Sequence, residues 1–298
     1  MIPRSVRCIS GLLLCLFVYL AGPSAACAHE ATDRTIQELS RQLVKSPREA
    51  NLYLRRGELH RFRREWSLAL LDYNKAAELN SKLHVVALCR AKLFLDMGLP
   101  LRARKAVESF LGEEPDSIQG LVTRAQVRRM LGEHLASGSD YTRLLSLIRE
   151  PRKPRPEYYI DRARVFVAAG EEHVGAAIRG LEEGIRRLGP VITLELCALD
   201  IEVDHKRYAA ALERLEGLAS RTVRPERWLA RRGEVLEAAG RETEACDAYL
   251  SALKAMETLP EHRQRTRQAS KLRAELHAAS RRLAALPQPP EVKSEELP

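Results

Sequence analysis

The sequence is poor in aromatic residues. Of its 298 residues, 5% are aromatic, whereas 45% are hydrophobic and 30% are charged. Few aromatic side chains disfavour a core built from sheets. The abundant alanine, leucine, arginine and glutamate favour helices, because these residues lose little rotamer freedom in a helix. The composition therefore predicts an all-α protein with enough apolar material for a large core.

Cysteine is also scarce, and its spacing excludes a disulfide framework. Six cysteines are present, and three of them (Cys8, Cys15 and Cys27) lie within the first 28 residues. The other three, Cys89, Cys197 and Cys246, are an odd number and have no Cys-x-x-Cys spacing. We interpret these three as single, buried thiols.

The motifs of catalysis and of metal binding are missing. The eight histidines show neither the His-x-x-x-His nor the His-Glu-x-x-His spacing of zinc sites, and no Gly-x-Ser-x-Gly elbow occurs. We therefore predict no catalytic residue, no metal ligand and no cofactor. The chain is interpreted as a protein that is not an enzyme.

A long hydrophobic run is absent, but a short one stands at the N-terminus. Arg4 and Arg7 precede the apolar stretch 8–20, and small residues with an Ala-x-Ala pattern follow at 26–28. Thirteen apolar residues form about 20 Å of helix, less than the roughly 30 Å of a bilayer core. Residues 1–28 are therefore predicted to be a secretory signal peptide, with an uncleaved anchor as the alternative. The mature protein is expected to be periplasmic or secreted.

Cys27 leaves a second possibility open. Two small residues, Ala25 and Ala26, precede it as in a bacterial lipoprotein signal, but Ser24 stands where a bulky aliphatic residue is usual. Lipidation of Cys27 would make the protein a membrane-anchored lipoprotein. Contact with a membrane is expected only if Cys27 is lipidated or the signal is not cleaved.

The sequence does contain an internal repeat. Arg-Arg-Gly-Glu occurs at 55–58 and again at 231–234, and small residues continue between them at intervals of 34, 34, 38, 35 and 35. Twelve residues after each of these anchors stands a second small residue. The anchors are Gly57, Ala91, Ala125, Ala163, Ala198 and Gly233, and the second set is Ala69, Ala103, Ser137, Gly175, Ala210 and Ala245.

Small residues at both positions fit a pair of closely packed helices. Two helices approach to about 8 Å only where the side chains at their crossing are small. We therefore expect Ala69 to meet Gly57 and Ala245 to meet Gly233. A single pair cannot bury its apolar face, so successive pairs are expected to stack.

This pattern resembles the tetratricopeptide repeat (TPR), a helix–turn–helix unit of 34 residues. The first and last copies match it best, because each also carries a tyrosine, Tyr73 or Tyr249, sixteen residues after its glycine. Arg179 and Arg214 stand where the second helix usually has an aromatic residue, which indicates a shifted register in copies four and five. The resemblance implies an all-α, right-handed α-solenoid of about six helix pairs with flanking capping helices.

The repeat predicts the organisation of the chain. After the signal peptide we expect a capping helix over 29–48, six repeats over 49–260, a basic capping helix over 261–286 and a disordered tail over 287–298. The repeats are expected at about 50–83, 84–117, 118–155, 156–190, 191–225 and 226–260.

The resemblance also implies a concave groove, lined by the first helix of each repeat, that accepts a peptide or a partner helix. Residues at the groove-facing positions are Arg55, Glu58, Arg61, Lys92, Gln126, Arg129, Arg164, Glu195, Glu202 and Glu234. Their charges predict a basic N-terminal half of the groove and an acidic C-terminal half.

Three functions fit these observations. The first is an exported scaffold that binds a protein or peptide, with an acidic segment favoured by Arg55, Arg61, Lys92, Arg129 and Arg164. The second is a lipid-anchored assembly factor of a bacterial envelope. The third is a basic module for an anionic polymer, which would use the basic insert 149–157 and the basic C-terminal helix of a chain with a net charge of +9. Nucleic acid is disfavoured, because stackable aromatic residues are not interleaved with the cations.

Overall fold

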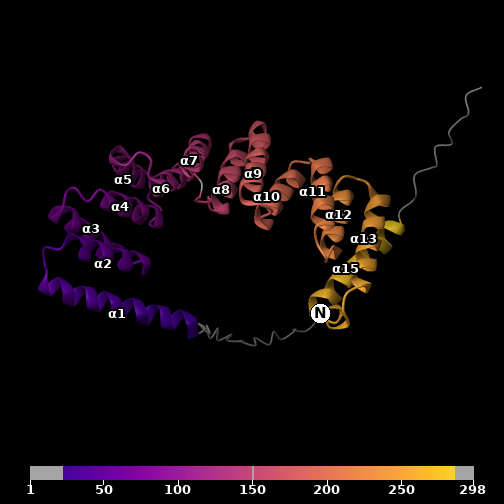
Figure 1. Cartoon of the computed structure of the whole chain (residues 1–298), viewed down its shortest axis with the longest axis horizontal. Coiled ribbons are helices and arrows are strands. Elements are labelled where there is room, and N and C mark those ends of the chain that lie inside the picture. The colour runs from indigo at the N-terminus through magenta and orange to yellow at the C-terminus, as the bar shows by residue number, and fades with distance from the viewer. Residues whose placement is uncertain (1–22, 150, 286–298) are drawn as a thin grey trace, which may run out of the picture. The chain divides into compact units, whose positions relative to one another are not determined.

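The computed structural model describes residues 23–149 and 151–285, and these residues form fifteen α-helices, one short 3-10 helix and no strand (Figure 1). The all-α prediction is confirmed. The helices are α1 (Pro23–Lys45), α2 (Ala50–Phe62), α3 (Trp66–Leu79), α4 (Val85–Asp96), α5 (Pro100–Glu113), α6 (Ile118–Met130), α7 (His134–Leu147), α8 (Pro156–Ala169), η1 (Glu171–His173), α9 (Val174–Leu188), α10 (Ile192–Asp204), α11 (Tyr208–Ser220), α12 (Glu226–Ala238), α13 (Glu242–Glu257), α14 (Glu261–Gln264) and α15 (Arg267–Ala284).

Most of the predicted signal peptide and tail lies outside the described residues. This applies to positions 1–22 and 286–298, and nothing is described of the Cys27 side chain. No helix among the described residues is long and apolar enough to cross a bilayer.

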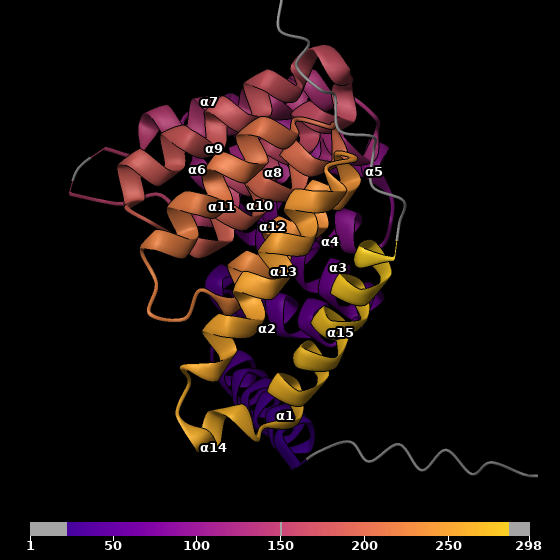
Figure 2. The same cartoon turned by 90° about the vertical axis from the view of Figure 1, so that its right-hand side faces the viewer.

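The chain divides between Leu99 and Pro100 into two units. The N-terminal unit contains α1–α4, and the C-terminal unit contains α5–α15. In the C-terminal unit each helix packs against the next one along the chain, from α5 to α13, and α15 then packs against α13 (Figure 2). In the N-terminal unit α1 packs on α2, α2 on α3 and α3 on α4.

The turns inside five helix pairs share one geometry. Each has three residues, and the middle one is left-handed: Gly98, Gly132 and Gly240 in three turns, Arg64 and Lys206 in the other two. The residue after it donates its N–H to a carbonyl five positions back, as Glu65 does to His60 at 2.9 Å. This bond satisfies one of the carbonyls left free at a helix end.

The second helix of each repeat buries a small residue at the equivalent position, and the register shift predicted for copies four and five is present. Relative to its anchor, α8 runs one residue further than α2, and the turn that follows is one residue longer. The buried residue therefore moves by two positions, from Gly175 to Ala177. Helix α10 is longer by one residue and its turn is not, so the shift is one position, from Ala210 to Ala211. The six fully buried residues are Ala69, Ala103, Ser137, Ala177, Ala211 and Ala245.

The same shift explains why Arg179 and Arg214 do not occupy the aromatic position of the second helix. The positions equivalent to Tyr73 and Tyr249 are Leu181 in α9 and Leu215 in α11, and both leucines are buried. Arg179 and Arg214 are displaced from that core position by two residues and by one residue.

The reason for glycine at the anchors differs from the prediction. A Cβ atom at Gly57 would lie 2.7 Å from Cε1 of Tyr73, and one at Gly233 would lie 2.5 Å from Cδ1 of Tyr249. The glycines are required by the tyrosine rings packed on them. Ala69 and Ala245 are buried, but they do not supply the nearest atoms.

The C-terminal basic helix is divided. Instead of one helix over 261–286, α14 ends at Gln264 and α15 begins at Arg267. The hydroxyl of Thr266 accepts a hydrogen bond from the N–H of Ala269 and so caps the start of α15. Leu276 and Leu283 of α15 join a core with Tyr249, Ala252 and other buried residues of α13.

Candidate functional site

Three adjoining cavities form a groove along the C-terminal unit. A cavity of about 520 Å³ lies between α8 and α10, and one of about 470 Å³ lies between α10 and α12. The third, about 650 Å³, lies between α12, the end of α13, α14 and the start of α15. Leu196 lines the first two cavities, and Arg227 and Arg231 line the last two. We call the three together the C-terminal groove.

The first two cavities have an apolar floor. Ile160 and Val167 of α8 face Leu196 and Ile201 of α10 in the first, and Trp228 of α12 lines the second. Leu196 is 38% exposed, which is unusual for a leucine in the middle of a helix between two others. Binding is favoured when a partner's apolar side chain covers such an exposed apolar floor and removes it from water.

Charged side chains surround the floor, and cations outnumber carboxylates. The lining cations are Arg164, Arg224, Arg227, Arg231, Arg263, Arg267 and Lys271, and the lining carboxylates are Asp200, Asp204, Glu226, Glu234 and Glu275. The acidic character predicted for this half of the groove is therefore wrong. It rested on Glu195, Glu202 and Glu234, and of these three only Glu234 lines the groove.

Glu195 and Glu202 are interior residues. They are 4% and 1% exposed, and both bind Arg214 of α11. Arg214 Nη1 lies 2.8 Å from Glu195 Oε2, and its Nε lies 3.0 Å from Glu202 Oε2. Glu182 of α9 completes the cluster, and Arg221 also reaches Glu195 at 3.0 Å.

The Arg214 cluster joins three helices. Burial alone would lower the pKa of Arg214, but its bonds to Glu202, Glu182 and Glu195 raise it above the ordinary value. The guanidinium is thus held charged, and its carboxylate partners cannot serve as contacts for a ligand. Sequence reasoning missed the cluster because its members come from different helices. One signal was available: Glu195 and Glu202 lie seven residues apart, hence on one face of their helix.

Two of the predicted groove residues do line the C-terminal groove. Arg164 borders the first cavity, where its only carboxylate partner among the described residues is Asp161, at 3.9 Å. Glu234 borders the third cavity and binds Arg231 at 2.6 Å. Gln126 and Arg129 lie on α6, half-buried and exposed, and line none of the three cavities.

The remaining predicted groove residues belong to the N-terminal unit. Arg55 is exposed, and Lys92 is half-buried on α4. Glu58 and Arg61 are engaged within the unit: Glu58 accepts hydrogen bonds from Tyr73 and Arg61, and Arg61 also binds Asp96. Burial raises the pKa of Glu58, but the Tyr73 hydroxyl and Arg61 outweigh burial and bring it below the ordinary value.

Cys89, the buried thiol of this unit, has a raised pKa. Burial, together with the neighbouring Glu58 carboxylate, raises the pKa of Cys89 to about 12. Cys197 and Cys246 are half-buried, so the expectation that all three thiols are buried holds fully for Cys89 alone.

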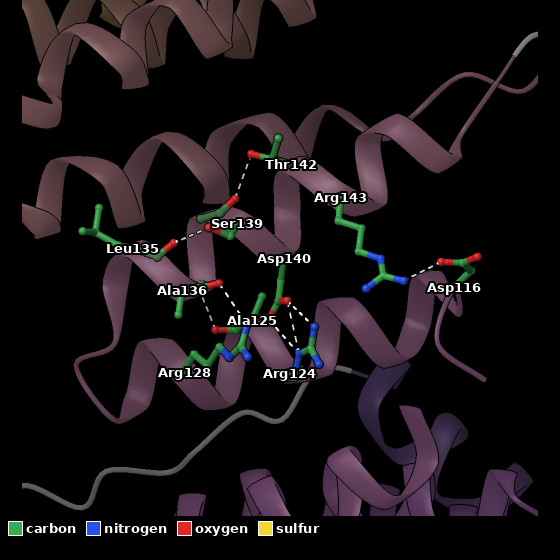
Figure 3. A network of polar contacts seen from close by, with 12 residues as sticks. Asp116, Arg124, Ala125, Arg128, Leu135, Ala136, Ser139, Asp140, Thr142 and Arg143 are labelled. Carbon is green, nitrogen blue, oxygen red and sulfur yellow. Dashed lines mark hydrogen bonds and ion pairs between the residues drawn. The ribbon is translucent and has the colours of Figure 1, made fainter. Parts of the chain in front are cut away.

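A buried ion pair recurs in the first and third repeats. Figure 3 shows the third, where Arg124 and Arg128 of α6 converge on Asp140 of α7. The distances are 2.6 Å from Arg124 Nη2 and 2.8 Å from Arg128 Nη1 to the carboxylate oxygens. Arg56 binds Asp72 in the same way at 2.7 Å. An arginine just before the anchor and an aspartate sixteen residues later would have revealed these pairs.

The described part of the chain contains no cluster that would hold a metal ion. No cluster of three or more histidine, cysteine or carboxylate side chains there has the arrangement of a metal site. The groove instead combines apolar surface with charges of both signs.

Comparison with known proteins supports the fold. No family model and no curated protein matches the sequence. Among solved structures, a tetratricopeptide repeat protein from Parabacteroides merdae is similar, with a TM-score of 0.50, 16% identity, and coverage of 85% of this chain and 95% of that one. The chain thus has a TPR-like fold.

Two further structures are similar at lower scores. PilF of Pseudomonas aeruginosa has a TM-score of 0.48 and 16% identity, covering 77% of this chain and 96% of its own. YrrB, described as a TPR protein with an unusual peptide-binding site, has a TM-score of 0.45 and 11% identity, covering 69% and 97%.

Proposed function

We propose that the protein is a non-catalytic scaffold that binds a segment of a partner protein in the C-terminal groove. The observation that carries this proposal is the continuity of the three cavities along α8, α10 and α12 to α15. A polypeptide is the ligand class that matches an extended groove with alternating apolar and charged surface.

The apolar floor provides the affinity in this proposal. Covering one leucine-sized side chain is worth about 1.5–3 kcal/mol, so two or three anchors in the first two cavities suffice for moderate binding. The surrounding charges select the partner and its direction, because each exposed ion pair contributes under about 1 kcal/mol.

Export belongs to the proposal as well. The N-terminal charged, apolar and small-residue segments support secretion to the periplasm or beyond, where the partner would be met. Mass spectrometry of the mature N-terminus separates a cleaved scaffold from a lipid-anchored assembly factor, which would carry acyl chains on Cys27.

A peptide-display selection tests the groove. A library of random twelve-residue peptides is selected on the wild-type chain, on Leu196→Asp and on Leu250→Asp. Leu196 lines two of the cavities, whereas Leu250 of α13 is 51% exposed and lines none of the three. Both changes place a charge on an exposed leucine of a helix, so Leu250→Asp is the matched control.

We expect the wild-type and Leu250→Asp chains to bind the selected peptides equally, and Leu196→Asp to bind them at least tenfold more weakly. Unchanged binding by Leu196→Asp would move the site away from the groove. A library that yields no binder on the wild-type chain would contradict the proposed function.

A further inference from the structure

The third cavity of the groove differs from the other two in its cations. Arg227, Arg263 and Arg267 line it, and among the described residues none of the three forms an ion pair. Within the described residues Arg227 donates only to the neutral Gln268, from Nη2 to Oε1 at 3.1 Å. By contrast, Arg231, Arg224 and Lys271 in the same cavity each have a carboxylate partner.

The segment that carries two of these arginines is held in place. Gln264 donates its side-chain amide to the carbonyls of Glu257 and Leu259, at 2.9 Å and 2.7 Å, which ties α14 to the end of α13. Thr266 caps α15, so Arg263 and Arg267 stand on either side of a fixed corner. Less conformational entropy is lost on binding when the cations are positioned beforehand.

Two helices begin at this cavity. The first turn of α12 contributes Glu226 and Arg227, and the first turn of α15 contributes Arg267, Gln268 and Ala269. The bond between Arg227 and Gln268 joins these two turns. The positive ends of both helix dipoles thus add to the potential of the arginines.

One acceptor in the wall of the cavity has no partner. Glu226 is 2% exposed, and its Oε1 accepts from Arg224 at 2.8 Å. Its second oxygen, Oε2, is buried and makes no hydrogen bond within the described residues. A buried carboxylate oxygen without a donor is costly, and a ligand that brings an N–H group would remove that cost.

We propose that the third cavity binds an acidic residue of the partner segment. The side-chain carboxylate is held by Arg263, Arg267 and Arg227, and a backbone N–H next to it donates to Glu226 Oε2. Met256, Leu259 and Leu272 form an apolar wall for the methylene groups of that residue. This inference rests on the proposed function, and it adds the chemistry that the end of the groove selects.

A simple polyanion does not explain the cavity as well. Phosphate groups would satisfy the arginines, but they carry no N–H donor for the unpaired Oε2 of Glu226. An aspartate or glutamate within a peptide brings the anion and the donor together.

The same display selection provides the test, using an added pair of variants. Arg263→Gln/Arg267→Gln removes two charges from the cavity. Arg265→Gln/Arg281→Gln removes two charges from exposed arginines of the same region that do not line it. Because all four side chains are exposed, melting temperatures should stay the same.

We expect aspartate or glutamate to be enriched at one position of the peptides selected on the wild-type and Arg265→Gln/Arg281→Gln chains. The enrichment should vanish on Arg263→Gln/Arg267→Gln. In fluorescence anisotropy, changing that acidic residue to its amide should weaken binding to the wild-type chain about tenfold and to the cavity variant less than twofold. Glu226→Gln should weaken binding of the acidic peptide severalfold.

Other outcomes overturn the inference. Peptides selected without acidic enrichment would refute it while leaving the proposed function intact. Tripolyphosphate competing as well as the acidic peptide would assign the cavity to anions in general, as would tighter peptide binding by Glu226→Gln. A synthetic peptide of residues 287–298 could also displace the selected peptide. If it does, and if peptides selected on the wild-type chain show no enrichment of aspartate or glutamate, the chain's own tail is the occupant.

Discussion

The first and last repeats have the same sequence pattern and the same helix crossing. In α2–α3 the ring of Tyr73 packs on Gly57, and in α12–α13 the ring of Tyr249 packs on Gly233. Both tyrosines and both glycines are buried. The polar residues beside the glycines, however, have different partners.

In the first repeat these polar residues are used internally. Glu58 accepts a hydrogen bond from the Tyr73 hydroxyl and pairs with Arg61, and Asp72 forms an ion pair with Arg56. In the last repeat the equivalent Glu234 is exposed, pairs with Arg231 and lines the third cavity. The repeat pattern therefore specifies how a helix pair packs. The residues at its surface positions can either form hydrogen bonds and ion pairs within the repeat or line a binding site.

The largest effect is expected from breaking the Arg214 cluster, which neither of these two repeats contains. Arg214→Met leaves Glu195 and Glu202 buried without a cation, and loss of a buried partner costs about 3–5 kcal/mol. The free energy of unfolding in urea measures this. Arg231→Met is the control: Arg231 also has two carboxylate partners, but they are exposed, so its loss should cost under about 1 kcal/mol. Equal losses for the two variants would contradict the distinction.

The second test asks whether the shared crossing contributes equally in both repeats. Gly57→Ala and Gly233→Ala each place a methyl group against a tyrosine ring, and each should cost about 1–3 kcal/mol through overpacking. Gly217→Ala in α11 is the matched control, since its added Cβ meets nothing within 4 Å. That change should be neutral or stabilise by up to about 1 kcal/mol, because alanine favours a helix. A tolerated alanine at either tyrosine-packed glycine would break the comparison.

A third test concerns the internal bonds of Glu58. Because the folded-state pKa of Glu58 is lowered, its contribution to stability is present above the ordinary value of 4.5 and is lost as pH falls through the folded-state pKa. Tyr73→Phe keeps the ring but removes the hydroxyl donor, so the net pKa of Glu58 should rise and stability near pH 7 should fall by about 1 kcal/mol. Unfolding in urea between pH 3 and pH 7 measures both. Parallel pH curves for Tyr73→Phe and the wild-type chain would show that the hydroxyl does not act on Glu58.

The smallest effect concerns the turns. Arg64 in the first repeat and Gly240 in the last both have a left-handed backbone, at φ of 60° and 73°. Arg64→Gly should stabilise by about 0.5 kcal/mol, since glycine adopts this conformation without strain, and Gly240→Ala should destabilise by about 1 kcal/mol. Thermal unfolding of the two variants should therefore shift in opposite directions. Shifts of the same sign would exclude backbone strain as the cause.

The helical class and the repeat period follow from the amino-acid sequence alone. Gly57, Ala69, Tyr73, Gly233, Ala245 and Tyr249 are all buried, as their spacing in the repeat predicts, but the glycines are required by the tyrosine rings and not by the alanines. The register shift in copies four and five was visible too, through Arg179 and Arg214. Its size was not visible, since it depends on one extra residue at the end of α8, one in the following turn and one at the end of α10.

The position of the groove and the balance of its charges become visible only in the folded chain. Glu195 and Glu202 are buried against Arg214 of α11 and do not lie on the expected surface, which removes the acidic half of the groove. The third cavity is formed by α12 and α15, whose first turns are about forty residues apart in the sequence and meet through Arg227 and Gln268. The physical reason is that a repeat period specifies contacts within a helix pair, while a site between pairs depends on side chains from several helices whose partners no local pattern records.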